Sequence, residues 1–222
     1  LGYGDYTLYR ERLDQLERQG THFARWGSVS SDSSGVTVGT DNHAAGFLAG
    51  AHLVESGRRA IAFLGHADGH YPEFRGRYLG LCEALGAAGI SPDPALQFDA
   101  ITTEEAGHRA TQSLIASGAR FDAIFAASDL IAIGAMRALK EAGRLVPEDI
   151  AVVGFDDIPA ASLTTPPLTT VMQDIRAAGQ ALVETLLAQI EGRDLPPRKL
   201  AGRLIVRGSS APAPAAASGA AS

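Results

Sequence analysis

The sequence predicts an α/β fold built on doubly wound parallel sheets, and two patterns support this prediction. Short runs rich in Val, Ile, Phe and Ala are typical of strands buried on both faces, and they are "RAIAFLG" (59–65), "FDAIFAAS" (121–128) and "IAVVGFD" (150–156). Helical segments that end in a glycine suited to a left-handed cap alternate with such runs, and these glycines are Gly20, Gly57, Gly89, Gly118 and Gly143. Strands alternating with helices indicate right-handed crossovers in a parallel sheet with helices on both sides.

Length and charge limit the classes of protein to consider. A chain of 222 residues is long enough for one large domain or two lobes. The net charge of −6 argues against a surface that neutralises nucleic-acid phosphates. No apolar stretch is long enough to span a bilayer, so we expect a soluble protein without a membrane partner. The single cysteine, Cys82, excludes an intrachain disulfide and fits a reducing, cytoplasmic compartment.

The two ends of the chain read differently from its middle. Leu1 is not an initiator, and "LGYGDYTLY" has no signal-peptide pattern, so we expect an upstream part to be missing. The last stretch, 209–222, is rich in Ala, Ser and Pro and has no large apolar side chain. Such a composition predicts a disordered tail.

Polar residues follow the predicted strands where a doubly wound sheet places its ligand. They are Trp26 after "THFAR", His66 after "AFLG", Ser128 and Asp129 after "IFAA", and Asp156 and Asp157 after "VVGF", joined by Asp5 and Tyr6 of the opening segment. Arg77 lies near the start of a predicted helix, from which its guanidinium can reach the same crevice, and Arg75 is a competing candidate.

Each candidate also has a structural interpretation. Asp156 or Asp157 can cap the turn that begins at "IPAAS", but two carboxylates leave one free to bind hydroxyls. For Asp129 the sequence favours an ordinary helix N-cap. Trp26 suits the core as well as it suits a ligand platform.

We predict neither a metal site, nor a cofactor, nor catalysis. The pair His66 and His70 lacks the further ligands that zinc or iron needs. The sequence has no GxSxG, GxxxxGK[ST], HExxH or GxGxxG motif. Adjacent carboxylates on one strand point in opposite directions, so they do not face each other across a substrate as in a glycosidase.

From "AVVGFDDIPAASLTTPPLTTVMQD" onward the chain resembles the effector domain of the LacI/GalR family of bacterial transcriptional regulators. The resemblance extends over "VGTDNHAAGFLAGAHLVESGRRAIAFLG", "RGRYLGLCEAL", "FDAIFAASDLIAIGAMRALKEAGRLVPEDIAVVGFDD" and "LIVRGSS". It implies the periplasmic-binding-protein-like type I architecture, in which two lobes are joined by three crossings and close on an effector. It also implies an incomplete first lobe and an absent helix-turn-helix.

The resemblance implies crossings near Thr40, Val171 and Pro196. The N-terminal lobe is then 1–40 plus 172–195, and the C-terminal lobe is 41–171 plus 196–208. It further implies dimer contacts on the helix from Leu130 and on residues 160–165, so we expect a homodimer.

The family's ligand contacts map onto Asp156, Arg77 and Gln173, and onto the loop containing Asp5. Ser128 stands where many members carry asparagine, and Thr102 stands where an aromatic residue commonly stacks on the ligand. Trp26, Tyr6 and Tyr71 are candidates for the missing apolar surface. The implied effector is a small carbohydrate, and the implied macromolecular partner is operator DNA bound through the absent helix-turn-helix. The alternative is a periplasmic or receptor-type sugar-binding protein.

Overall fold

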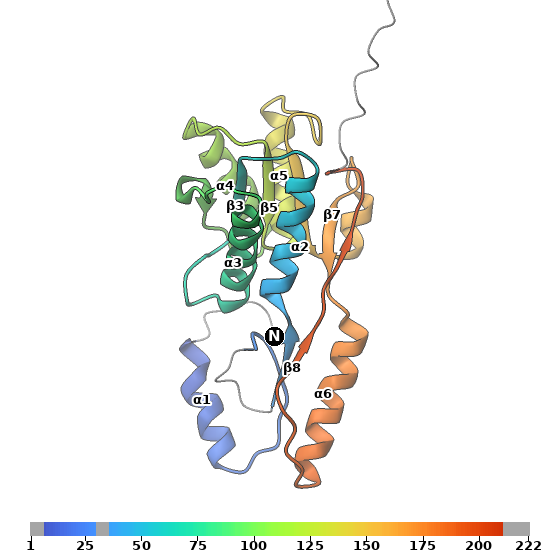
Figure 1. The fold of residues 1–222 in the computed structure, drawn as a ribbon. Coiled ribbons are helices and arrows are strands. Elements are labelled where there is room, and N and C mark those ends of the chain that lie inside the picture. Colours follow the sequence, from blue (N-terminus) through green and yellow to red (C-terminus); the bar gives the residue numbers. More distant parts are fainter. Residues whose placement is uncertain (1–6, 30–35, 211–222) are drawn as a thin grey trace, which may run out of the picture.

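The computed structural model describes residues 7–29 and 36–210, which form two sheets stacked end to end (Figure 1). The smaller sheet holds three parallel strands in the order β1 (Arg25–Trp26), β2 (Thr37–Thr40) and β8 (Arg198–Leu200). Two helices, α1 (Thr7–Arg18) and α6 (Ile175–Ile190), lie beside this sheet at the lower end of Figure 1.

The larger sheet has six strands in the order β4-β3-β5-β6-β7-β9. Their bounds are β3 (Ile61–Leu64), β4 (Gln97–Phe98), β5 (Ala123–Ala126), β6 (Ala151–Asp156), β7 (Thr169–Met172) and β9 (Arg203–Ile205). Every neighbouring pair is parallel except β7 and β9. The α/β prediction with parallel sheets is therefore confirmed.

Four helices pack on the larger sheet as two close pairs. The pairs are α2 (Asn42–Glu55) with α3 (Pro72–Ala87), and α4 (Glu104–Ala116) with α5 (Asp129–Glu141). Glycines allow the backbones to touch, because a Cβ on Gly80 would lie 2.1 Å from the carbonyl oxygen of His43. Two 3₁₀ turns, η1 (Pro94–Leu96) and η2 (Pro159–Leu163), complete the described elements.

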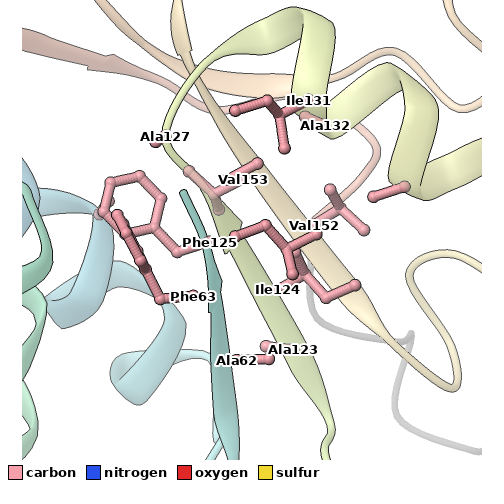
Figure 2. Packing of buried hydrophobic residues seen from close by; sticks show 14 of the residues in the cluster. Ala62, Phe63, Ala123, Ile124, Phe125, Ala127, Ile131, Ala132, Val152 and Val153 are labelled. Atoms are coloured by element: carbon pink, nitrogen blue, oxygen red, sulfur yellow. The ribbon is translucent and has the colours of Figure 1, made fainter. Parts of the chain in front are cut away.

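The core lies on both faces of the three central strands, β3, β5 and β6 (Figure 2). All four residues of β5 are buried, and the Phe63 and Phe125 rings meet edge to face at 5.6 Å. The sequence prediction of strands buried on both faces is confirmed here. The five predicted cap glycines also adopt positive φ, between 68° at Gly143 and 89° at Gly57.

The chain passes between the two sheets three times, at Asp41, at Gln173 to Asp174, and at Ala201 to Gly202. The expected third crossing near Pro196 was wrong. Strand β8 pairs with β2 and so still belongs to the smaller sheet, which moves that crossing five or six residues along the chain. Gly202 fits tightly at the crossing, because an added Cβ would lie 3.0 Å from Val171 and 3.2 Å from Ala45.

The predicted tail boundary at 209 was also wrong. Ser209 and Ser210 are buried, and the Ser209 hydroxyl donates to the carbonyl of Val152 at 2.6 Å. The Ser210 hydroxyl donates to Thr169 Oγ1 at 2.7 Å and lies 2.7 Å from His52 Nε2. These polar contacts anchor two small residues that composition alone assigns to a tail, while 211–222 lie outside the described residues.

Among the helices of the described residues, none has the length and apolar character needed to cross a bilayer.

Candidate functional site

A line of hydrogen bonds joins the carboxyl ends of three strands where the two sheets meet. Gln173, just after β7, donates from Nε2 to Asp156 Oδ1 at 2.6 Å. The Thr40 hydroxyl, at the end of β2, donates to Gln173 Oε1 at 2.6 Å. Since β2 belongs to the smaller sheet and Asp156 to the larger one, this line connects the two sheets directly.

Arg77 continues the polar arrangement from helix α3. Its Nε donates to Asn42 Oδ1 at 2.8 Å, and its Nη1 donates to the carbonyl of Ala127 at the end of β5. Its guanidinium lies on the ring of Phe155, 3.5 Å from the centroid, which is a cation–π contact. The side chain is only 1% exposed, so burial and these contacts hold the guanidinium in one orientation.

The predicted trio of Asp156, Arg77 and Gln173 is therefore brought to one region by the fold. Asn42 completes the connection, because its Nδ2 donates to the carbonyl of Thr40 at 3.1 Å while its Oδ1 accepts from Arg77. A carboxylate, an amide and a guanidinium from different strands and helices thus meet at the edge where ligands bind in doubly wound folds.

The backbone at the carboxyl end of β6 adopts a conformation that residues other than glycine rarely take. Asp156 has φ 115° and Asp157 has φ 56°. Aspartate tolerates positive φ better than most residues, but two in succession cost about 1–3 kcal/mol each. Strain of this kind persists only where the surroundings fix it, and it clusters at ligand sites.

Two contacts fix this strained turn. Arg207 Nη2 donates to Asp157 Oδ1 at 2.7 Å, and the backbone N–H of Ile158 donates to Asp129 Oδ2 at 2.9 Å. The turn η2 is capped by Ile158 without a side-chain hydrogen bond, so neither carboxylate serves as the helix cap that the sequence allowed. Asp157 is instead paired with Arg207. Asp156 is the member of the pair that is linked to the smaller sheet, through its hydrogen bond with Gln173.

The N-cap expectation for Asp129 was wrong, because the adjacent Ser128 takes that role. The Ser128 hydroxyl accepts from the backbone N–H of Ile131 at 3.3 Å, and Asp129 is the first residue of α5. Asp129 is fully buried and accepts from the Thr170 hydroxyl at 2.6 Å as well as from Ile158. A Cβ on Gly154 would lie 2.3 Å from Asp129 Oδ1, so glycine is required beneath this carboxyl.

Asp129 should make the stability of the fold depend on pH. Burial raises the pKa of Asp129 from its usual 3.8 to about 7, although the Thr170 and Ile158 hydrogen bonds oppose the shift. A raised pKa means that the folded state binds the proton more tightly, so this contribution is complete below pH 3.8 and is lost as the pH rises through about 7. We expect the free energy of unfolding, measured with urea between pH 5 and 8, to fall more steeply in the native chain than in Asp129→Asn. Parallel pH profiles of the two proteins would contradict this assignment.

An aromatic pair stands at the carboxyl end of β3. The rings of His66 and Tyr71 stack with centroids 4.2 Å apart and an interplanar angle of 12°. His66 Nδ1 lies 3.7 Å from Asp68 Oδ2 and 3.5 Å from Asp99 Oδ1. Among residues 7–29 and 36–210, no three His, Cys, Asp or Glu side chains are grouped to hold a metal ion.

The remaining predicted site residues lie on other elements or outside the described residues. Trp26 ends β1, pairs with Val38 in register and is half-buried. Thr102 lies in the bend after β4, and its buried hydroxyl has no hydrogen-bond partner among the described residues. Asp5 and Tyr6 lie outside the described residues.

Sequence reasoning missed four residues of this region, namely Thr40, Asn42, Phe155 and Arg207. Thr40 and Asn42 lie at or next to the predicted first crossing, and Phe155 immediately precedes the two aspartates. Their positions in the sequence could therefore have pointed to them. Arg207 had no such signal, because its ion pair with Asp157 joins residues 50 positions apart.

Two cavities lie elsewhere in the described residues. One, of about 220 Å³, is lined by residues between Gly20 and Phe23, by Thr185 and Gln189 of α6, and by Leu195. The other, of about 550 Å³, is a groove between the first and third crossings whose lining includes Asp41, Phe47 and Lys199. Both are distinct from the line of hydrogen bonds through Asp156 and Gln173.

Residues 50–210 match the family model of the periplasmic binding protein-like domain, which agrees with the two sheets joined by three crossings. Among curated proteins, the chain is 36% identical over 217 residues to the HTH-type transcriptional regulator MalR of Streptomyces coelicolor. That alignment covers 96% of this chain and 62% of MalR, so the chain spans about three fifths of its relative's length.

Solved structures give the same result. A sugar-binding transcriptional regulator of the LacI family from Escherichia coli, complexed with phosphate, has a TM-score of 0.81 and 32% identity, covering 92% of this chain and 73% of that one. The complex of the transcriptional regulator CelR with cellobiose has a TM-score of 0.82 and 34% identity, covering 89% of this chain and 61% of that one. The chain belongs to the LacI family of transcriptional regulators. These relatives are regulators and not enzymes.

Proposed function

We propose that this chain is the ligand-sensing part of a LacI-type transcriptional regulator and that it binds a small carbohydrate between its two sheets. The observation that carries the proposal is the line from Asp156 through Gln173 to Thr40, because polar side chains of both sheets, which are our candidates for ligand binding, lie within hydrogen-bond distance of each other there. A molecule bound at this line contacts both halves of the fold at once.

The chemistry of the residues favours a hydroxyl-rich ligand. The Asp156 carboxylate accepts hydrogen bonds from vicinal hydroxyls, and charge-assisted bonds of this kind are about twice as strong as neutral ones. Gln173 supplies both a donor and an acceptor. Tyr71 is packed between His66 and Phe74, with ring centroids 4.2 Å and 6.1 Å away, so within this stack it is His66 whose outer ring face can lie against the C–H face of a sugar.

The sheets suggest a division into two lobes that differs slightly from the one expected. We assign 7–40 together with 174–200 to the first lobe, and 42–172 together with 203–210 to the second, with Gln173 between them. The lobes then pivot about the three short crossings, where Asp41 and Lys199 form an exposed ion pair at 3.7 Å.

Regulation follows if the ligand binds one lobe orientation more tightly than the other, since only differential affinity shifts such an equilibrium. A cytoplasmic homodimer carrying a helix-turn-helix on each subunit has to match two half-sites about one helical turn apart. A modest change in lobe orientation then changes operator affinity. Helix α5 and the turn η2 are the proposed dimer contacts, and Leu163 of η2 is 81% exposed.

The alternative, a periplasmic or receptor-type sugar-binding protein, shares the fold. The curated relatives favour the regulator, because MalR, AscG and CelR, all 36–37% identical, are named HTH-type transcriptional regulators.

A thermal-shift screen of the chain with monosaccharides, disaccharides and sugar phosphates tests the proposal. At a hundredfold excess over Kd, the ligand should stabilise the fold by about 2.7 kcal/mol. For a domain of this size that corresponds to a rise in melting temperature of about 5–10 °C. Purines and amino acids serve as the comparison set. A response to one of these, with none to any carbohydrate, would remove the proposed effector class.

A further inference from the structure

The third crossing changes its pairing partner within a very short stretch of chain. On the side of the smaller sheet, Leu200 of β8 pairs in register with Thr40. On the side of the larger sheet, Arg203 of β9 pairs with Met172. Only residues 201–202 lie between these two ladders, where the chain passes from β8 toward the side of β7 (Figure 1). A change in the angle between the sheets has to be taken up at such a point, because hinges are the few residues at the ends of elements that absorb changes in φ and ψ.

One side of this point is closely packed. A Cβ on Gly202 would lie 3.0 Å from Val171 Cγ1 and 3.2 Å from the Ala45 Cβ. Val171 and Ala45 are both fully buried, so they are held in place by the core of the larger lobe. Packed interiors have low compressibility, and the crossing therefore has no room to move toward β7 and α2.

The other side of the same point is open. The groove of about 550 Å³ is lined by Ala201 and Gly202 of the crossing, by Ala44 and Phe47 of α2, and by Glu83 of α3. Ala44, Glu83 and Ala201 are exposed. A displacement of the crossing in this direction enters open space instead of the core.

Resting on the two-lobe sensing function proposed above, we propose that the lobes tilt in one sense only, with the third crossing moving at Gly202 away from Val171 and into the groove. The orientation in this structure is then one end of the range, and a tilted orientation with a narrower groove is the other. The ligand acts by favouring one of these two orientations. The groove is a place where that choice can be changed without altering Asp156 or Gln173.

Two substitutions should shift the equilibrium between these orientations in opposite directions. Gly202→Ala places a methyl group against Val171 and should favour the tilted orientation. Ala44→Phe fills part of the groove from α2 and should favour the orientation in this structure. Ala116→Phe, the same change at an exposed position of α4, is the matched control. Adding Val171→Ala to Gly202→Ala removes the nearest contact of the new methyl group and should return the hinge toward native behaviour.

Pulsed electron paramagnetic resonance between two spin labels measures the tilt. Labels at the exposed positions Val183 of α6 and Gln112 of α4 report on one lobe each, in a chain whose single cysteine is removed as Cys82→Ser. Without ligand, we expect the mean distances in Gly202→Ala and Ala44→Phe to differ by about 2 Å or more, with the native chain and the control between them. Equal distances in the two variants overturn the inference.

Carbohydrate affinity gives an independent readout. Because the ligand favours one orientation, the two substitutions should change Kd in opposite directions, one of them by about fivefold or more. A loss of affinity in both variants would mean that they only damage the fold, and it overturns the inference.

The outcomes separate this inference from the proposed function. If no carbohydrate binds the native chain, the proposed function fails, while the spin-label distances still decide how the hinge moves. Melting temperatures of the unliganded variants show whether each is folded. If Gly202→Ala does not fold, the comparison of Ala44→Phe with Ala116→Phe decides alone, and equal distances and equal Kd in those two overturn the inference.

Discussion

Replacing Arg77 by alanine is expected to lower the free energy of unfolding by about 3–5 kcal/mol. The substitution leaves Asn42 Oδ1 and the Ala127 carbonyl without their donor in a buried region, and each unsatisfied group costs about 1–3 kcal/mol. It also removes the group that packs on the Phe155 ring and leaves a cavity there. Urea unfolding measures the difference directly as a shift in the transition midpoint.

Two variants control this prediction. Arg77→Lys keeps the charge but cannot reproduce the planar, forked contacts, so we expect a smaller loss of about 2 kcal/mol. Arg75→Ala changes an exposed arginine on the same helix and should alter stability by less than about 0.5 kcal/mol. If Arg75→Ala proved as costly as Arg77→Ala, the central position assigned to Arg77 would be wrong.

Replacing Asp156 by asparagine is expected to weaken carbohydrate binding by about 10- to 100-fold, because hydrogen bonds to a charged group are worth about 1.5–3 kcal/mol. At a ligand concentration that stabilises the native chain by about 2.7 kcal/mol, a hundredfold loss leaves only about 0.4 kcal/mol. Asparagine is preferable to alanine here because it tolerates the φ of 115° and can still accept from Gln173 Nε2. The measurement is the ligand-induced rise in melting temperature.

Asp157→Asn is the matched control for that experiment. It alters the neighbouring carboxylate, also at positive φ, and removes the ion pair with Arg207 without touching the line to Gln173. We expect a modest loss of stability, about 1 kcal/mol, and an unchanged ligand response. The reverse pattern, with ligand response lost in Asp157→Asn and kept in Asp156→Asn, would mean that the roles of the two aspartates are exchanged.

The larger sheet could be predicted from the sequence because its central strands carry strong local signals. The runs that became β3, β5 and β6 are apolar on both faces, and glycines end the helices between them. The position of Asp156 followed from strand order, since parallel strands end at one edge. Arg77 was predicted from its place near the start of a helix, and Gln173 only from the resemblance to the LacI/GalR family.

Other features depend on pairings between distant residues, which sequence periodicity does not encode. Strand β8 is short and half-exposed, and its pairing with β2 links positions about 160 residues apart. Ser209 and Ser210 read as part of a polar tail, yet hydrogen bonds with Val152 and Thr169 hold them in the interior. Ser128 and Asp129 both suit an N-cap, and only the structure shows that Thr170 and Ile158 engage Asp129 from other elements.

A crystal structure of the chain with the carbohydrate that binds best in the thermal screen tests the central claim most directly. We predict sugar hydroxyls within hydrogen-bond distance, about 3 Å, of the Asp156 carboxylate and of at least one residue from the first lobe. Sugar density in the groove lined by Asp41, Phe47 and Lys199, with the contact between Asp156 and Gln173 unchanged and unoccupied, would contradict it.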